Sequence, residues 1–494
     1  MNFISTRNAD RVVSGAEAVV KGLSDEGGLF VPALFPEITE AEIKAMADMT
    51  YPERAAFVIG KFLPELKDLP EYTEKAYARF DGDPAPVVKL DEGTFMLELW
   101  HGPTHAFKDI ALTFLPYLMT GSKAATGEKT RTLILVATSG DTGKAALEGF
   151  RDVDGTDVIV FYPSGGVSEL QKLQMITQTG DNVFVSAING NFDDAQTAVK
   201  KIFTDEATAA ELRKRGFALS SANSMNFGRL VPQIAYYFSS YVDLMDAGEI
   251  EYGDEVNFCV PSGNFGNILA GYYAKRMGLP IGRLICASNR NNVLTDFIGS
   301  GKYAAKRKFY KTTSPSMDIL VSSNLERLVF ELSGRNDELT ARRMKSLAET
   351  GTYSISDFEL AEMQETFWAE WANEEEVRDT IAYELEEDGY IVDTHTAVAK
   401  CVADKYYEKN EDDRPVVVVS TASPYKFAAD VYSAIGGKPA SDPFKTIELL
   451  EEETALPVPD SITELKNLER RFTGTINPDE AARTVINYAK NKKN

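Results

Sequence analysis

Short apolar runs alternate with longer amphipathic stretches through most of the chain. From about Thr132 onward these runs are continuously apolar and are separated by segments of helical period; they are TLILVATS, DVIVFY, NVFVSAI, VNFCVPS, RLICAS and VVVVSTAS. Strands that are apolar on both faces are typical of a parallel sheet covered by helices. The pattern therefore predicts an α/β fold, in which ligands bind at the carboxyl ends of the strands.

Four segments follow from where this pattern begins and ends. Residues 1–95 combine helical stretches with two strands in VVKLDEGTFMLELW, which predicts an extra N-terminal domain. Residues 96–250 and 251–440 hold the apolar runs and predict two subdomains of one α/β unit. Residues 441–494 are rich in acidic side chains and predict a helical tail on the surface.

Residues 302–393 interrupt the second subdomain. Apolar residues recur there at spacings of three and four in the runs LERLVFELS, ELTARRMKSLAET and FELAEMQETFWAEWA. This period predicts a mostly helical insertion. Trp368 and Trp371 would then lie on the inner face of an amphipathic helix.

Charge and composition narrow the class of protein. The chain has 494 residues and a formal net charge of -23 at pH 7. Nucleic acids and anionic membranes attract clustered Lys and Arg, so this charge disfavours both as partners. Three cysteines and three histidines show no metal-ligand spacing, so we expect neither a disulfide framework nor a metal site. The N-terminus lacks an apolar signal core and no run is long enough to span a bilayer, so we expect a cytoplasmic protein.

The segment HGPTHAFKDI places Lys108 at the start of a helix, between Phe107 and Ile110. Apolar neighbours would partly remove water from its amine, which lowers the amine pKa and makes it nucleophilic. The alternative is a surface lysine paired with Asp109, which is the commoner situation for a lysine. Other motifs have to decide between the two.

The segment CVPSGNFGN carries a candidate phosphate site. A buried strand runs into a Gly-rich turn and then into the helical stretch ILAGYYAKRM. Gly263 and Gly266 permit close approach of the backbone, and the helix N-terminus presents free amides to an anion. A purely structural turn would use the same residues.

The loop ATSGDTG also follows an apolar strand and opens a helix. Hydroxyl groups of Thr138, Ser139 and Thr142, together with helix amides, are suited to a carboxylate, although they could equally form a helix N-cap. After the strand VVVVS, Thr421 could offer its hydroxyl to a ring nitrogen, or could cap the turn before Pro424. A nucleophilic lysine, a phosphate cradle, a carboxylate loop and this hydroxyl together are what a pyridoxal-phosphate site requires.

These motifs resemble the threonine synthase family, in its longer branch from bacteria and fungi. HGPTHAFKD, ATSGDTG, SANSMNFGRL, PSGNFGN and TASPYKF resemble motifs of that branch, and the opening TRNADRVVSGAEAVVKGLSDEGGLFVP resembles its N-terminal domain. The resemblance covers nearly the whole chain. It implies a fold-type II pyridoxal-phosphate enzyme, similar to the tryptophan synthase β subunit, with an added N-terminal domain.

The resemblance also implies roles for individual residues. Lys108 would attach the cofactor pyridoxal 5'-phosphate and act as the catalytic base. The residues that would hold the cofactor's phosphate are Gly263, Asn264, Phe265 and Asn267, and Thr421 would meet its pyridine nitrogen. Related cofactor enzymes usually have Asn where this chain has Asp141, so Asp141 would be protonated, turned away or directed at the substrate ammonium.

The substrate's phosphate needs donors of its own. Arg229 is the first candidate, because a guanidinium binds phosphate through paired hydrogen bonds. Lys144 and Ser224 are weaker candidates, and a helix-surface role remains the alternative for Arg229. His105 could orient the site or simply pack, and His395 would act only in a supporting position.

The family's reaction is a phosphate-releasing carbon–oxygen lyase reaction. It converts O-phospho-L-homoserine and water into L-threonine and phosphate by γ-elimination and β-addition of water. The resemblance therefore implies a small-molecule substrate and threonine biosynthesis. A phospholyase that releases 2-oxobutanoate and ammonia is the alternative within this class, and a non-catalytic phosphate-binding module is the alternative outside it. Monomer and homodimer both stay open.

Overall fold

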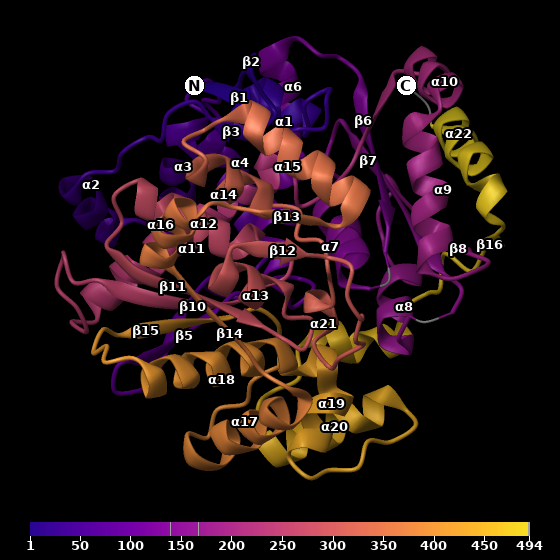
Figure 1. The fold of residues 1–494 in the computed structure, drawn as a ribbon. Coiled ribbons are helices and arrows are strands. Elements are labelled where there is room, and N and C mark those ends of the chain that lie inside the picture. Colours follow the sequence, from indigo (N-terminus) through magenta and orange to yellow (C-terminus); the bar gives the residue numbers. More distant parts are fainter. Residues whose placement is uncertain (139, 166, 493–494) are drawn as a thin grey trace.

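Two sheets of mainly parallel strands carry the predicted apolar runs (Figure 1). The computed structural model describes residues 1–138, 140–165 and 167–492. A six-stranded sheet has the order β14-β11-β10-β15-β5-β4, with strands β4 Val87–Asp91, β5 Thr94–Glu98, β10 Val256–Pro261, β11 Ile281–Ser288, β14 Phe367–Trp371 and β15 Val416–Ser420. All neighbours in this sheet are parallel except the antiparallel pair β4 and β5.

The second sheet is smaller and wholly parallel. Its order is β16-β8-β7-β6-β9, with strands β6 Arg131–Ala137, β7 Thr156–Pro163, β8 Val183–Ile188, β9 Phe217–Ser220 and β16 Thr475–Ile476. Two antiparallel sheets complete the strands: β2-β1-β3 near the N-terminus (β1 Asn2–Ser5, β2 Asn8–Ser14, β3 Phe30–Pro32) and the pair β12 Lys302–Ala304 and β13 Thr352–Ser354.

Helices cover both large sheets. The first half of the chain contains α1 Gly15–Lys21, α2 Glu40–Ala45, α3 Tyr51–Phe62, α4 Leu69–Tyr77, α5 Lys108–Leu112, α6 Leu115–Thr126, α7 Asp141–Phe150, α8 Glu169–Ile176, α9 Phe192–Thr204, α10 Glu206–Lys214 and α11 Phe227–Asp246. The second half contains α12 Gly266–Arg276, α13 Val293–Ser300, α14 Leu325–Leu332, α15 Asp337–Thr350, α16 Asp357–Thr366, α17 Glu374–Glu387, α18 Thr394–Lys409, α19 Ala428–Ala434, α20 Pro443–Thr454, α21 Asp460–Thr463 and α22 Ala481–Asn491. Short 3-10 turns lie at Met46–Asp48, Pro315–Met317, Pro424–Phe427, Glu464–Asn467 and Pro478–Glu480.

The predicted α/β class is confirmed, because each of the six apolar runs forms a strand of a parallel sheet. Every residue of β7, β10 and β15 is buried, as expected for strands covered on both faces. Helix α18 lies along the six-stranded sheet, and the C-terminal helix α22 lies beside α9 next to the smaller sheet (Figure 1).

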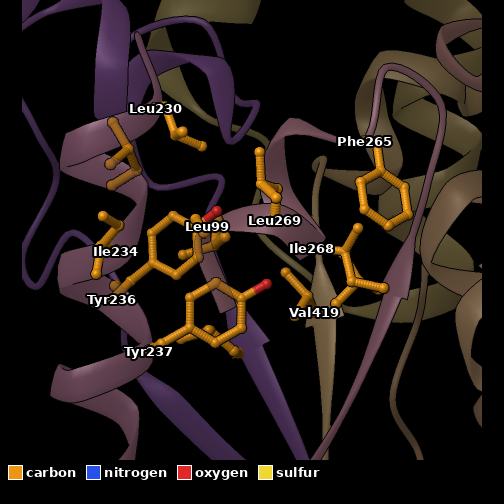
Figure 2. Close-up of a cluster of buried hydrophobic side chains, with 14 of the residues drawn as sticks. Leu99, Leu230, Ile234, Tyr236, Tyr237, Phe265, Ile268, Leu269 and Val419 are labelled. Atoms are coloured by element: carbon orange, nitrogen blue, oxygen red, sulfur yellow. The ribbon is translucent and has the colours of Figure 1, made fainter. Parts of the chain in front are cut away.

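The main core lies where α11 packs against α12. Tyr236 and Tyr237 of α11 lie beside Ile268 and Leu269 of α12, close to Val419 of β15 (Figure 2). Both tyrosine hydroxyls donate to the side-chain oxygen of Asn267, at 2.7 and 2.9 Å. A buried phenol needs such an acceptor, so the core and the start of α12 hold each other in place.

The predicted helix for Trp368 and Trp371 is wrong. Helix α16 ends at Thr366, and both tryptophans belong to β14, which pairs with β11 as an edge strand. The segment FWAEW is rich in aromatic residues, which favour strands, and the exposed edge of β11 offers it a partner. Pairing with a distant strand therefore outweighs the helical spacing of the segment that precedes it.

Three features of the ends were not predicted. The N-terminal segment contains the sheet β2-β1-β3, and the expected boundary at residue 95 falls inside β5, whose hairpin with β4 joins the six-stranded sheet. The acidic tail includes the two-residue strand β16, which pairs with β8 as well as adding helices. Both ends of the chain thus contribute strands to sheets that sequence periodicity did not connect to them.

Other properties bear on the predicted classes of site. None of the helices in the described ranges is both long and apolar enough to cross a membrane. Over those same ranges, no group of three or more His, Cys, Asp or Glu side chains is arranged to hold a metal ion. Cys259, Cys286 and Cys401 are free and buried.

The contact between α5 and α7 sets the relative position of Lys108 and Asp141, which begin these two helices. Gly149 of α7 lies against the end of α5, where an added Cβ would overlap the carbonyl oxygen of Leu112. Only a residue without a side chain allows this approach of the two helices.

We predict that Gly149→Ala lowers the free energy of unfolding by about 1–3 kcal/mol, because the helices must move apart. Gly60→Ala is the matched control. Gly60 lies in helix α3, and an added Cβ would lie 3.8 Å from Leu69, which is an ordinary contact distance. This control should gain about 0.5–1 kcal/mol from helix propensity. Thermal denaturation followed by circular dichroism measures both, and equal melting temperatures would contradict the prediction.

Candidate active site

A cavity of about 690 Å³ opens where the carboxyl ends of β6, β10 and β15 meet the first turns of α5 and α11. Ten of the residues singled out from the sequence line it: Lys108, Thr138, Asp141, Thr142, Arg229, Gly263, Asn264, Phe265, Asn267 and Thr421. Ser139, another of them, lies outside the described residues. Motifs that are far apart in the chain therefore meet around one space.

Backbone pairing holds Lys108 opposite Thr421. The Phe107 amide donates to the Thr421 carbonyl at 2.9 Å, and Ala106 and Ala422 form an isolated antiparallel bridge. The Lys108 amine lies 3.5 Å from the Ser316 hydroxyl and 5.0 Å from the centre of the Phe107 ring. Burial lowers the pKa of Lys108, with Lys426 and Arg229 adding to this effect and Asp141 opposing it.

The neighbouring Asp109 is not the partner of Lys108. Its two carboxylate oxygens accept from the amide and the hydroxyl of Thr104, at 2.8 and 2.6 Å. Burial raises the pKa of Asp109 to about 6, partly offset by these two bonds. The alternative of a surface Lys108–Asp109 pair is therefore not what the structure contains.

His105 packs behind the cavity and does not line it. Its backbone is left-handed, with φ 57, and its Nε2 lies 2.6 Å from the Ser461 hydroxyl. Burial lowers the pKa of His105 to about 3, so the ring is neutral. These contacts support a structural role.

The start of α12 forms a cradle for an anion. Phe265 caps the helix in the left-handed region, with φ 60, and its buried ring packs on Phe367, so its backbone and not its ring faces the turn. A Cβ on Gly263 would lie 3.0 Å from the Ser316 carbonyl oxygen. The side-chain NH2 of Asn267 is buried and has no hydrogen-bond partner in the described part of the chain. An unsatisfied buried donor at a helix N-terminus is suited to an anionic ligand.

Asp141 is paired with a residue to which the sequence reasoning assigned no role. Its carboxylate lies 3.1 Å from the Lys426 amine and accepts from Gln171 at 3.1 Å. Burial alone would raise the pKa of Asp141, but Lys426 and Lys108 hold it well below the usual range. Asp141 is therefore ionised. Lys426 belongs to the motif TASPYKF, so the sequence already marked its segment as part of the site. Nothing in the sequence, however, links Lys426 to Asp141.

The hydroxyl of Thr138 serves the loop itself. It donates to the Gly140 carbonyl at 3.0 Å and accepts from the amides of Gly140 and Gly143 at 3.0 and 3.2 Å. Thr138 therefore binds an amide in the first turn of α7 although Gly140 is the N-cap residue, and the carboxylate site stays a prediction. Thr142, in the first turn of α7, also lines the cavity.

Arg229 brings a buried positive charge to the cavity. It is 5% exposed, and one guanidinium nitrogen donates to the Ala222 carbonyl at 2.6 Å. Within the described ranges its Nε has no hydrogen-bond partner, and no carboxylate acts on its charge. Burial lowers the pKa of Arg229 to about 10. A buried guanidinium without a counter-ion is costly, so its position indicates an anionic ligand.

The two weaker candidates for binding the substrate's phosphate, Ser224 and Lys144, differ in position. Ser224 lines the cavity, whereas Lys144 does not. The Lys144 amine binds Gln178 at 2.6 Å and Glu148 at 3.4 Å. Because Lys144 pairs with Glu148 and does not line the cavity, we do not assign the substrate phosphate to it.

A buried His–Asp pair also borders the cavity. The Nδ1 of His395 lies 2.9 Å from Asp393, and its Nε2 accepts from the Ser316 amide at 3.2 Å. His395 therefore positions Ser316, whose hydroxyl is the neighbour of Lys108. The spacing Asp-Thr-His at the start of α18 was visible in the sequence, but the segment that it holds comes from a distant loop.

The mouth of the cavity involves two further parts of the chain. Lys21, Gly22 and Leu23, which follow or end helix α1, line one part of the wall. Side chains of α9, including Lys200 and Phe203, line another. The N-terminal segment is thus part of the site and not only a support for the fold.

Comparisons with known proteins agree along the whole chain. Residues 2–77 match the family described as Threonine synthase N terminus, residues 81–422 match Pyridoxal-phosphate dependent enzyme, and residues 396–486 match Threonine synthase, C-terminal. Threonine synthase-like 1 of Homo sapiens is 40% identical over 479 residues, which cover 92% of this chain but only 64% of that protein. The chain thus spans less than two thirds of the length of this relative.

Two further relatives match over nearly their full length. Threonine synthase of Pseudomonas aeruginosa is 38% identical over 464 residues, covering 92% of this chain and 96% of that one. The crystal structure of pyridoxal-phosphate-bound threonine synthase from Brucella melitensis superposes with a TM-score of 0.89 at 37% identity, covering 99% of this chain and 100% of that chain. Matching sequence, fold and site motifs together place this chain in the threonine synthase family of pyridoxal-phosphate-dependent enzymes.

Proposed function

We propose that this chain is a threonine synthase, a carbon–oxygen lyase that converts O-phospho-L-homoserine and water into L-threonine and phosphate. The observation that carries the proposal is the pair of anion sites in one cavity. One is the α12 N-terminus with the unpartnered NH2 of Asn267, and the other is the guanidinium of Arg229. A phosphorylated cofactor and a phosphorylated substrate require two such sites.

The residues around α12 fit pyridoxal phosphate. We assign its phosphate to Gly263, Asn264, Phe265 and Asn267, because the turn is narrow and the Asn267 donor is unsatisfied. We assign its covalent attachment to Lys108 and its ring nitrogen to the hydroxyl of Thr421. When bound, the cofactor supplies an electron sink for a carbanion at the substrate's α-carbon.

Lys108 is the proposed acid and base. Its lowered pKa provides a neutral amine at lower pH than an exposed lysine would, and a neutral amine accepts the proton from the α-carbon. The same amine returns a proton when the product forms. Ser316 lies within reach of this amine and restrains its position.

Arg229 is the proposed ligand of the substrate's phosphate, and the loop of Thr138, Ser139 and Thr142 is the proposed site of its carboxylate. Thr138 contributes to this loop by fixing its shape. We retain the cytoplasmic location, the monomeric or homodimeric state and the division at residues 95, 250 and 440 as predictions.

Product analysis tests the proposal. The purified, cofactor-loaded chain is incubated with O-phospho-L-homoserine, and both phosphate and the organic product are identified. We expect L-threonine and phosphate in equal amounts. Release of 2-oxobutanoate and ammonia would instead identify a phospholyase, and absence of phosphate release would refute the substrate assignment.

Lys108→Ala should lower turnover by about 10²–10⁴-fold or more, because the proposed acid and base is removed. Lys75→Ala is the control, since Lys75 is exposed on α4, where it pairs with Glu71. Steady-state phosphate release measures both variants. Unimpaired turnover in Lys108→Ala would exclude this lysine as the base.

Arg229→Met should raise the KM for O-phospho-L-homoserine about 10- to 100-fold, which corresponds to lost hydrogen bonds to a charged group. Its melting temperature should change little: the removed charge has no counter-ion within the described ranges, and this gain offsets the lost bond to the Ala222 carbonyl. Arg343→Met is the matched control: Arg343 binds Glu359 through two bonds of 2.6 Å, and neither residue lines the cavity. Loss of that pair should lower the melting temperature without changing KM. A stability loss in Arg229→Met with unchanged KM would mean that Arg229 is structural.

A further inference from the structure

Lys426 lies where three loops of the site meet. It belongs to the 3-10 turn Pro424–Phe427, just after β15, and its side chain is 4% exposed. Its amine donates to the Thr104 carbonyl at 2.7 Å and pairs with Asp141 at 3.1 Å. Thr104 belongs to the loop that leads into Lys108, and Asp141 begins α7. A single ammonium group therefore joins the loops of Lys108, Asp141 and Thr421.

Asp141 and Lys108 line the same cavity, so the carboxylate of Asp141 can attract the Lys108 amine. Its side chain is 8% exposed, and it acts on Lys108 by direct charge attraction. The groups that act on the Lys108 charge are Asp141, Lys426, Arg229 and Asp109, and those that act on Asp141 include Lys426, Lys108 and His395. Where both groups are buried, an ionised carboxylate without a partner would attract a neighbouring ammonium strongly.

We propose that Lys426 is a positioning residue, which holds the charge of Asp141 so that this carboxylate does not capture Lys108. Attraction by Asp141 and repulsion by Lys426 then oppose each other at Lys108, and burial is the largest influence on the amine. The inference rests on the proposed attachment of the cofactor at Lys108.

A purely structural ion pair would behave differently. Breaking a buried pair destabilises the fold whichever role it serves, so stability alone does not separate the two roles. The positioning role has an additional signature at Lys108: removing either partner must shift the protonation of the Lys108 nitrogen, and the two shifts must have opposite signs.

The test is a pH titration of the visible absorption of the full chain loaded with pyridoxal phosphate. In Lys426→Met the unbalanced carboxylate favours the protonated Lys108 nitrogen, so the midpoint should move up by about one pH unit or more. In Asp141→Asn the unbalanced ammonium has the opposite effect, so the midpoint should move down. The double variant Lys426→Met/Asp141→Asn should return close to the wild-type midpoint, and Lys426→Arg should stay there.

Several outcomes would overturn the inference. An unchanged midpoint in Asp141→Asn, or shifts of the same sign in both single variants, would mean that the pair does not act on Lys108. Asp141→Asn provides this test even if Lys426→Met fails to fold, and circular dichroism identifies that case. If the wild-type chain binds pyridoxal phosphate and borohydride does not trap it at Lys108, the proposed function fails together with the inference. A trapped cofactor with unmoved midpoints would overturn the inference alone.

Discussion

The site depends on a short antiparallel contact between the Lys108 loop and the segment that follows β15. Phe107 donates to Thr421, Ser423 donates to His105, and Ala106 pairs with Ala422. Through these backbone bonds the end of a central strand fixes the start of α5. Side-chain contacts alone would leave a loop free to move, whereas paired backbone groups set its register. The lysine proposed to bind the cofactor and the hydroxyl proposed to meet the ring nitrogen are therefore held together by the main chain.

Around this contact, the cavity is organised by charge in a buried setting. The chain carries a net charge of -23, so its overall field opposes anionic ligands, and local features must attract them. Arg229 and the α12 N-terminus provide this attraction without carboxylate partners of their own within the described ranges. Asp141 and Lys426, in contrast, form an ion pair in which the two charges neutralise each other. Burial strengthens each of these interactions, which explains why few groups suffice.

The strongest predictions came from segments whose local pattern and tertiary environment agree. The six apolar runs became strands, because a run buried on both faces has few other arrangements. For Trp368 and Trp371 the local pattern and the tertiary environment disagree. Their segment follows a stretch of helical spacing, but it forms a strand because it pairs with the edge of β11. The strand β16 was invisible for a similar reason: two residues carry no period, and only pairing with β8 defines them.

By itself, the sequence determined the α/β class, the family and the motifs that line the cavity, because strand hydrophobicity, Gly-rich turns and motif order are local properties of the chain. Only the tertiary structure decided which of these residues bear on one another. It paired Asp141 with Lys426, left Arg229 without a counter-ion within the described ranges, bound Lys144 to Glu148 and brought Ser316 to Lys108 through His395. These contacts join residues separated by long stretches of chain, so no spacing in the sequence records them. Their energies arise from burial, which exists only once the sheets and helices have packed.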